Sequence, residues 1–199
     1  MDSQRDIAIS ILNQKALVKT KELNNAGVHR ETIRRMVADG EIIKVARGLY
    51  SSPEYIPNER YSLIEAQKIV NKGVVCLLSA LSYHEIGTQN PSEVWMAIPR
   101  GSRHPRIEYS PIRLITFSGE AYTKGIKSIQ IDEEKISIYN IPKTIADCFK
   151  YRNKIGLEVA VEALKDVLQN KRVTVDELLH YAEICRVRNI ITPYIESLV

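Results

Sequence analysis

The chain has 199 residues, of which 44% are hydrophobic and 26% charged, values typical of a globular protein with a substantial core. Its formal net charge of +4 permits binding to nucleic acid without demanding it. The N-terminus lacks the pattern of a secretory signal, and the longest apolar run, at 74–78, is far too short to cross a membrane, so we expect a cytoplasmic protein without a membrane partner.

The first 50 residues have the element order of a winged helix-turn-helix. Apolar spacing and turn residues predict helices over 4–14, 20–26 and 29–39, then strands at 41–46 and 49–51. Thr20 is the expected N-cap of the second helix, and Gly27 is expected to end it because glycine tolerates the left-handed backbone common at helix ends. Gly40 ends the third helix, which follows His29, a residue type that caps helices poorly.

Residues 51–60 are rich in polar residues and hold two prolines, so they are the expected linker between a DNA-binding domain over 1–55 and a second domain over 60–199. The second domain is expected to contain helices over 61–72, 74–87, 142–152, 156–169, 174–186 and 190–198, and strands at 93–99, 112–118, 128–131 and 135–141. Thr174 and Glu177 have the spacing of a capping box. The expected fold class is α+β, a winged helix-turn-helix followed by a mixed α/β domain with a small sheet and several helices.

At about 100° per residue, the third helix has one apolar and one polar face. Ile33, Met36 and Val37 fall on one side, where we expect them to pack against the first two helices. The opposite side is free to enter a major groove, where an arginine can make two parallel hydrogen bonds to guanine. The residues expected to contact DNA are Lys19, Lys21, Arg30, Glu31, Thr32, Arg34, Arg35, Ala38 and Arg47, the last at the tip of the predicted hairpin.

A basic, solvated helix used for protein contact is the alternative explanation of this arginine-rich face, because such faces are common. The ordered set of a helix, a Gly-Val turn, an arginine face and a two-residue wing is more specific and favours DNA binding. Residues 1–50 also contain nine Lys or Arg against six Asp or Glu, a net charge of +3.

A basic loop follows the strand predicted at 93–99. Arg100, Arg103, His104 and Arg106 fall within seven residues, with no acidic residue among them. This loop is a candidate partner-binding site, because it can contact nucleic acid or an acidic protein surface. The alternative is a solvated loop without a partner.

Other residues give weaker signals of chemistry. Glu133 and Lys135 have the Glu-x-Lys spacing of some nucleases, but a charged turn between two strands explains them better. His84 lies near two serines without a GxSxG elbow, so we expect a hydrogen-bonded structural histidine. With no CxxC pair, the three cysteines are expected to be small core residues: Cys76, Cys148 and Cys185. We therefore expect no catalytic residue, metal or cofactor.

Three blocks of the sequence resemble the AbiEi family of antitoxins, from type IV toxin–antitoxin systems. They are GVHRETIRRMVADGEIIKVARGLY, CLLSALSYHEIGTQNPSEVWMAIPRG and IYNIPKTIADCFKYRNKIGLEVAVEAL, in this order along most of the chain. The resemblance implies a non-enzymatic protein whose N-terminal domain binds inverted repeats of double-stranded DNA in its own promoter and represses the operon. It also implies a C-terminal domain that counters a nucleotidyltransferase-like toxin, directly or indirectly, in systems linked to phage defence.

Two alternatives stay open from the sequence. One is a stand-alone winged-helix regulator whose second domain senses a ligand or a partner. The other is a DNA-processing enzyme that uses Glu133 and Lys135.

Overall fold

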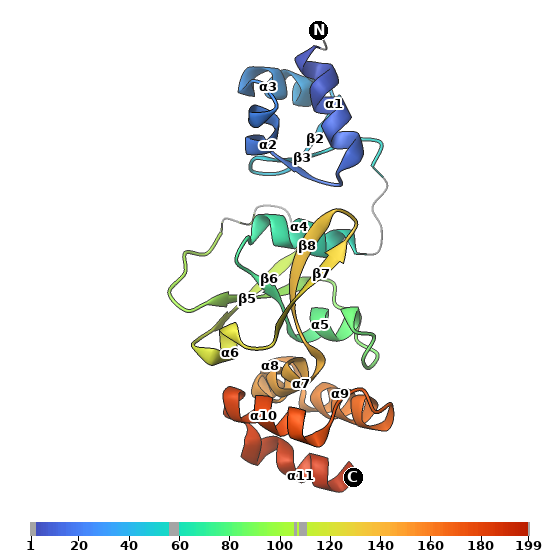
Figure 1. The fold of residues 1–199 in the computed structure, drawn as a ribbon, viewed down its shortest axis with the longest axis vertical. Coiled ribbons are helices and arrows are strands. Elements are labelled where there is room, and N and C mark those ends of the chain that lie inside the picture. Colours follow the sequence, from blue (N-terminus) through green and yellow to red (C-terminus); the bar gives the residue numbers. More distant parts are fainter. Residues whose placement is uncertain (1–2, 56–59, 106, 108–110, 199) are drawn as a thin grey trace. The chain divides into compact units, whose positions relative to one another are not determined.

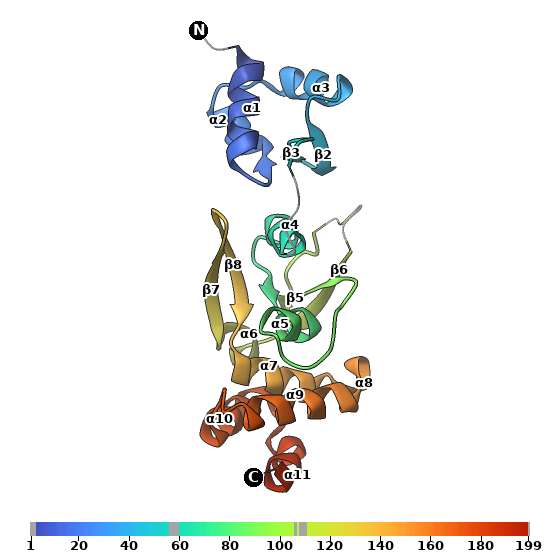
Figure 2. The ribbon, with the colours of Figure 1, turned by 90° about the vertical axis from the view of Figure 1, so that its right-hand side faces the viewer.

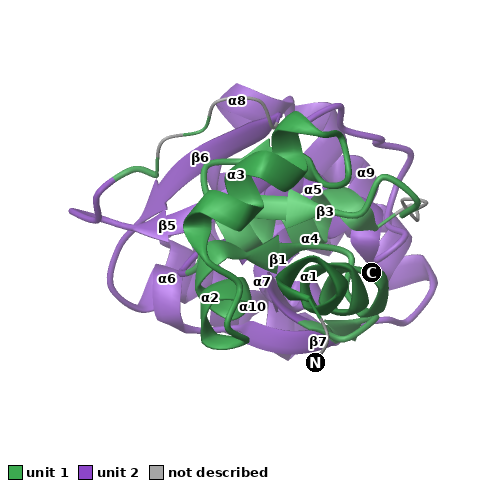
Figure 3. Cartoon of the chain, turned by 90° about the horizontal axis from the view of Figure 1, so that it is seen from above, with its two compact units in different colours: residues 1–71, 104–110, 130–134 green, residues 72–103, 111–129, 135–199 purple. Residues whose placement is uncertain are grey.

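The computed structural model describes residues 3–55, 60–105, 107 and 111–198. The chain divides into two compact units, shown in different colours in Figure 3. Unit 1 comprises residues 1–71, 104–110 and 130–134, and unit 2 comprises residues 72–103, 111–129 and 135–199. Each unit is built around its own apolar core.

The N-terminal part of unit 1 has three helices and a three-stranded antiparallel sheet (Figure 1). The elements are α1 (Gln4–Gln14), β1 (Val18–Lys19), α2 (Thr20–Asn25), α3 (Arg30–Ala38), β2 (Ile43–Ala46) and β3 (Leu49–Ser51). The strands are ordered β1-β3-β2, so β3 lies between the other two. This arrangement confirms the predicted winged helix-turn-helix and adds β1, a strand that the sequence pattern did not indicate.

The core of this part joins all three helices. Buried side chains from α1, α2 and α3 pack together, among them Ala8, Leu12, Leu23 and Ile33. The backbone of Gly27 has φ +86°, which agrees with the predicted end of α2. The prediction that Thr20 caps α2 is wrong, because Lys19 holds the N-cap position and its N–H donates to Glu22 Oε2 at 2.9 Å.

Helix α4 (Tyr61–Ile69) also belongs to unit 1, and its one lysine connects three segments of that unit. Lys68 Nζ donates to the carbonyl oxygen of Leu17 at 2.6 Å and forms an ion pair with Glu134 Oε1 at 2.7 Å. The Lys68 side chain is only 9% exposed, so its ammonium group depends on these partners in place of water.

Unit 2 combines a mixed sheet with a group of helices (Figure 2). Its elements are β4 (Val74–Val75), α5 (Leu77–Tyr83), β5 (Val94–Pro99), β6 (Ile112–Phe117), α6 (Glu120–Thr123), β7 (Ile126–Ile131), β8 (Glu134–Tyr139), α7 (Ile141–Lys150), α8 (Arg152–Ile155), α9 (Leu157–Gln169), α10 (Val175–Cys185) and α11 (Arg188–Leu198), although the ends of β7 and β8 at 130–134 fall in unit 1. The strand order is β6-β5-β4-β8-β7. Strand β4 pairs antiparallel with β5 and parallel with β8, and β5 pairs parallel with β6.

The sequence located all four of the longer strands and the helices α7, α9, α10 and α11, but it did not indicate the short helices α6 and α8. The helix predicted over 74–87 is wrong at its start, because Val74 and Val75 form a short strand and α5 begins only at Leu77. Both valines are buried between β5 and β8, where β-branched side chains pack well. The predicted capping box is confirmed, since Thr174 Oγ1 accepts from the Glu177 N–H at 3.2 Å and the Thr174 N–H donates to Glu177 Oε2 at 2.8 Å.

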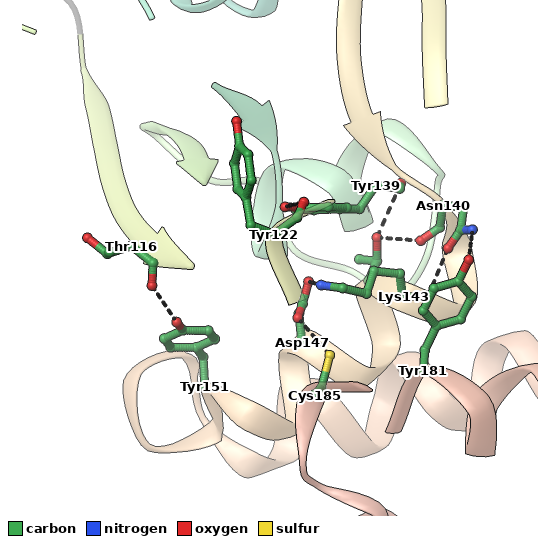
Figure 4. Close-up of polar contacts among 10 residues, drawn as sticks. Thr116, Tyr122, Tyr139, Asn140, Lys143, Asp147, Tyr151, Tyr181 and Cys185 are labelled. Atoms are coloured by element: carbon green, nitrogen blue, oxygen red, sulfur yellow. Dashed lines mark hydrogen bonds and ion pairs between the residues drawn. The ribbon is translucent and has the colours of Figure 1, made fainter. Parts of the chain in front are cut away.

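Helix α7 is the central helix of unit 2 and packs against α5, α9 and α10. It is buried on almost every side, although it carries charged residues. Lys143 and Asp147 are both fully buried one helical turn apart, and Lys143 Nζ lies 2.5 Å from Asp147 Oδ2 (Figure 4). The other carboxylate oxygen of Asp147 accepts from Cys185 Sγ at 3.2 Å.

Aromatic rings complete the surroundings of this ion pair. Lys143 Nζ lies 4.2 Å from the ring centroid of Tyr139 and 4.8 Å from that of Phe117, distances typical of cation–π interactions. Burial raises the pKa of the Asp147 carboxyl above its ordinary value, and the Lys143 ammonium offsets part of that rise. The Lys143–Asp147 ion pair is therefore buried inside unit 2 and contacts side chains from several helices and strands.

The expectations for His84 and the cysteines are confirmed. Half-buried His84 has Nε2 2.8 Å from the carbonyl oxygen of Tyr139, which is the contact of a structural histidine. The three cysteines are buried and free: Cys76, Cys148 and Cys185. Burial raises the pKa of each of these thiols, so they stay protonated and unreactive at neutral pH.

Candidate nucleic-acid interface

Helix α3 has the two faces that its sequence predicted. Ile33 and Met36 are 2% and 0% exposed and anchor the helix in the core of unit 1. On the other side, the side chains of Arg34 and Arg35 are 78% and 67% exposed. Arg30, Glu31 and Ala38 are exposed as well. The helix therefore presents a polar face to solvent while its apolar face fixes its position.

A glutamine on α1 caps the start of α3. Gln4 Oε1 accepts from the His29 N–H at 3.0 Å and from Thr32 Oγ1 at 2.7 Å. His29 occupies the N-cap position, but its side chain makes no capping hydrogen bond. Gln4 thus satisfies the backbone N–H of the N-cap residue, as the N3 glutamate does in a capping box, and it holds the hydroxyl of Thr32, a predicted DNA contact, on the side of α1.

The C-terminal end of α3 is held by Arg5, which follows Gln4 in α1. Arg5 Nη2 forms an ion pair with Asp39 Oδ2 at 2.8 Å, and Arg5 Nη1 pairs with Glu41. Asp39 is the C-cap residue of α3. Two consecutive residues of α1 therefore contact both ends of the candidate recognition helix. Sequence reasoning missed both, because partners 25 and 34 residues away leave no local signal.

The exposed face of α3 carries an intrahelical cluster of three charged side chains. Arg34 donates to both carboxylate oxygens of Glu31, from Nη2 to Oε1 at 2.9 Å and from Nε to Oε2 at 3.1 Å. Arg35 Nε donates to Glu31 Oε1 at 3.3 Å. The hydrogen bond from Arg34 is the main reason that the pKa of Glu31 lies below its ordinary value, so this carboxyl is ionised at neutral pH.

The wing lies beside the start of α2. Arg47 is exposed in the tight turn between β2 and β3, as predicted for a wing tip. The carbonyl oxygen of Gly48 accepts from the Thr20 N–H at 2.9 Å and from Thr20 Oγ1 at 3.2 Å. Gly48 has φ +70°, and a Cβ added there would lie 3.0 Å from Thr20 Oγ1. The turn therefore needs glycine for both its backbone angle and its close approach to α2.

The two predicted lysine contacts differ in their surroundings. Lys21 is exposed on α2. Lys19 is half-buried, and its ammonium group donates to Asn71 Oδ1. Burial lowers the pKa of Lys19, and the neighbouring charge of Lys68 lowers it further. Lys19 must leave Asn71 before it can contact a phosphate, whereas Lys21 is already accessible.

The basic loop after β5 is described only in part. Arg100, Arg103 and His104 are exposed, whereas Arg106 lies outside the described residues. The Arg100 N–H donates to the carbonyl oxygen of Phe117 at 2.8 Å, which ties the start of the loop to β6. The role of this loop in partner binding stays a prediction.

The charged segment considered for nuclease chemistry is a turn. Asp132 and Glu133 connect β7 to β8, as the simpler explanation predicted. Within the described parts of the chain, no group of three or more His, Cys, Asp or Glu residues is placed to hold a metal ion. Nor does any helix of those parts have the length and apolar character needed to cross a membrane.

The three-helix core, the exposed arginine helix and the β-wing place the N-terminal region in the winged helix-turn-helix class. Residues 5–53 match the sequence model of the family described as "Transcriptional regulator, AbiEi antitoxin". This match confirms the resemblance to the AbiEi antitoxins over the N-terminal region.

The fold is also similar to that of a solved protein. The crystal structure of the Rv2827c protein from Mycobacterium tuberculosis has a TM-score of 0.65 with this chain, covering 92% of this chain and 72% of that one. The two sequences are 13% identical, so the similarity concerns the fold alone. No curated protein sequence matches the chain.

Proposed function

We propose that the protein binds the promoter DNA of its own operon through α3 and the wing, and represses that operon. The observation that carries this proposal is the division of α3 into a buried anchor, Ile33 and Met36, and an exposed face with Arg34 and Arg35. A helix fixed on one side can lie in a major groove with its other side against base edges. Inverted repeats are the expected form of the operator.

The second half of the proposal concerns a toxin. We propose that the protein neutralises a nucleotidyltransferase-like toxin, directly or indirectly, as its AbiEi-type N-terminal region suggests. The exposed cations Arg100 and Arg103 suit contact with an acidic surface on such a partner.

DNA binding is tested by substituting the arginines of α3. In a titration of promoter DNA, Arg34→Ala/Arg35→Ala is expected to bind about tenfold to hundredfold more weakly, the value for one bidentate base contact. The matched control is Lys127→Ala/Lys165→Ala, which removes two exposed charges of unit 2 and is expected to retain affinity. Wild-type affinity and an unchanged salt dependence in the arginine variant would show that α3 is not the recognition helix.

The toxin role is tested in cells. The neighbouring gene is expressed alone and then together with this protein, and growth is measured. We expect toxicity that the wild-type protein relieves and that Arg100→Ala/Arg103→Ala/Arg106→Ala relieves less well. A neighbouring gene that is harmless when expressed alone would favour a stand-alone regulator, and full rescue by the triple variant would remove the loop from the mechanism.

A further inference from the structure

Glu31 is the single acidic residue within α3, and it lies on the face that carries the exposed arginines. DNA is a polyanion, so a carboxylate on a DNA-facing surface weakens general attraction to the phosphates. Exposed ion pairs also add little to the stability of a folded protein. A carboxylate in the first turn of α3 also interacts favourably with the helix dipole, but that interaction does not require contacts with the arginines. Neither DNA attraction nor the dipole therefore explains the hydrogen bonds from Arg34 and Arg35 to Glu31.

The geometry of the cluster indicates what Glu31 does to each arginine. Arg34 uses Nε and Nη2 for the carboxylate, which is one edge of its planar guanidinium group. The edge formed by Nη1 and Nη2 keeps one parallel N–H on each nitrogen. That pair of donors matches the O6 and N7 acceptors of guanine.

Arg35 is held differently. It makes one longer hydrogen bond to Glu31, from Nε at 3.3 Å, and its terminal nitrogens have no hydrogen bond to the residues that the structure describes. A single contact restricts the rotation of the guanidinium plane less than the two contacts of Arg34 do. Arg35 therefore suits a phosphate, for which orientation matters less.

We propose that Glu31 is a specificity-determining residue that orients Arg34 to read one guanine in the major groove and leaves Arg35 for the phosphate backbone. The inference rests on the proposed binding of promoter DNA and specifies which base that site recognises. An arginine has many rotamers in solution, and holding it in one of them lowers the entropy lost on binding a base. The same hydrogen bonds to Glu31 keep Arg34 from contacting the phosphates of unrelated DNA sequences.

The test compares the ratio of affinities for promoter DNA and random-sequence DNA. Glu31→Gln removes the charge at nearly constant shape, and we expect it to bind random DNA about two- to fivefold more tightly while the ratio falls about tenfold. Glu54→Gln removes an exposed acidic charge outside α3 and is expected to leave the ratio unchanged. Circular dichroism checks that each variant is folded.

Two further measurements separate orientation of Arg34 from a general change of charge. In the Arg34→Ala background, Glu31→Gln is expected to lower the ratio no further, because the residue it orients is gone. Replacing individual guanines of the promoter by 7-deazaguanine removes the N7 acceptor. One such replacement per half-site is expected to weaken the wild-type protein strongly, Glu31→Gln less, and Arg34→Ala not at all.

The outcomes distinguish this inference from the function on which it rests. A wild-type protein that does not prefer its promoter to random DNA overturns both. A wild-type protein with that preference, together with a Glu31→Gln variant whose ratio is unchanged, overturns the role of Glu31 alone.

Discussion

Replacing Lys143 by methionine tests whether the buried carboxylate of Asp147 depends on Lys143 as its counter-ion. The substitution keeps most of the length of the side chain but removes the ammonium group beside Asp147. Breaking one partner of a buried pair typically costs about 3–5 kcal/mol, because a charge is left in a region from which water is excluded. The carboxyl can escape that cost by taking up a proton, which limits the loss.

The pH sets the largest loss of stability that protonation of Asp147 allows. A carboxyl with an unfolded-state pKa of about 3.9 that is forced to be neutral in the folded state costs about 1.4 kcal/mol per pH unit above that value. The ceiling is therefore about 4 kcal/mol at pH 7 and about 1.5 kcal/mol at pH 5. Loss of the contacts with Tyr139 and Phe117 adds about 1 kcal/mol at either pH.

The sign of the pH dependence is fixed by which state holds the proton. In Lys143→Met, the pKa of Asp147 rises further above its unfolded value, so the folded state keeps a proton that the unfolded state has released. Stability then falls as the pH rises from about 4 towards the folded-state pKa. Adding Asp147→Asn should remove this dependence on pH, since an amide does not titrate.

Urea unfolding followed by tryptophan fluorescence measures the effect on unit 2 alone. Trp95 is the one tryptophan of the chain, lies on β5, and is 3% exposed. Lys165→Met, at an exposed position of α9, is the control and should change stability by less than about 0.5 kcal/mol. A loss below about 1 kcal/mol for Lys143→Met at pH 7, or equal losses at pH 5 and pH 7, would refute the assignment of Lys143 as the counter-ion of Asp147.

Two further substitutions test contacts that link distant segments. Gln4→Ala should destabilise α3 by about 1–2 kcal/mol, because the helix loses the contacts of Gln4 at its start, and amide exchange in α3 should become faster. Gln4→Glu retains an acceptor oxygen and should keep most of the protection against exchange. Unchanged exchange in Gln4→Ala would contradict the role of Gln4 at the start of α3. Gly125→Ala should cost about 2–4 kcal/mol, since its Cβ would lie 2.8 Å from Lys143 Cβ at φ +79°. Gly101→Ala, with φ +80° and open space around the added Cβ, should cost only about 1–2 kcal/mol, and equal losses at the two glycines would rule out the clash.

The face of α3 could be predicted from sequence because helical periodicity is a local property. Ile33 and Met36 recur at the spacing that buries one side of a helix, whatever the rest of the chain does. Strand β4 could not be predicted in this way. Val74 and Val75 are strand residues only because β5 and β8 flank them, and both partners lie far away in the sequence.

The buried charges of unit 2 also could not be predicted from local sequence patterns. Lys143 and Asp147 are visible in the sequence as an i, i+4 pair, a spacing more common on exposed helix surfaces. Their burial depends on α7 being covered by several elements at once. The link from Gln4 to His29 is likewise invisible, since no rule of local spacing connects residues 25 positions apart.

The way in which α3 is attached has a consequence for the proposed reading of DNA sequence. The helix is fixed by its buried side and by contacts at its two ends, through Gln4 and Arg5. The side chains of Arg30, Arg34 and Arg35 contribute nothing to that attachment in the described structure. Mutation can therefore exchange them with little risk to folding. Under the proposed DNA-binding role, related proteins on this scaffold can then diverge to different operators and stay insulated from one another in a shared cell.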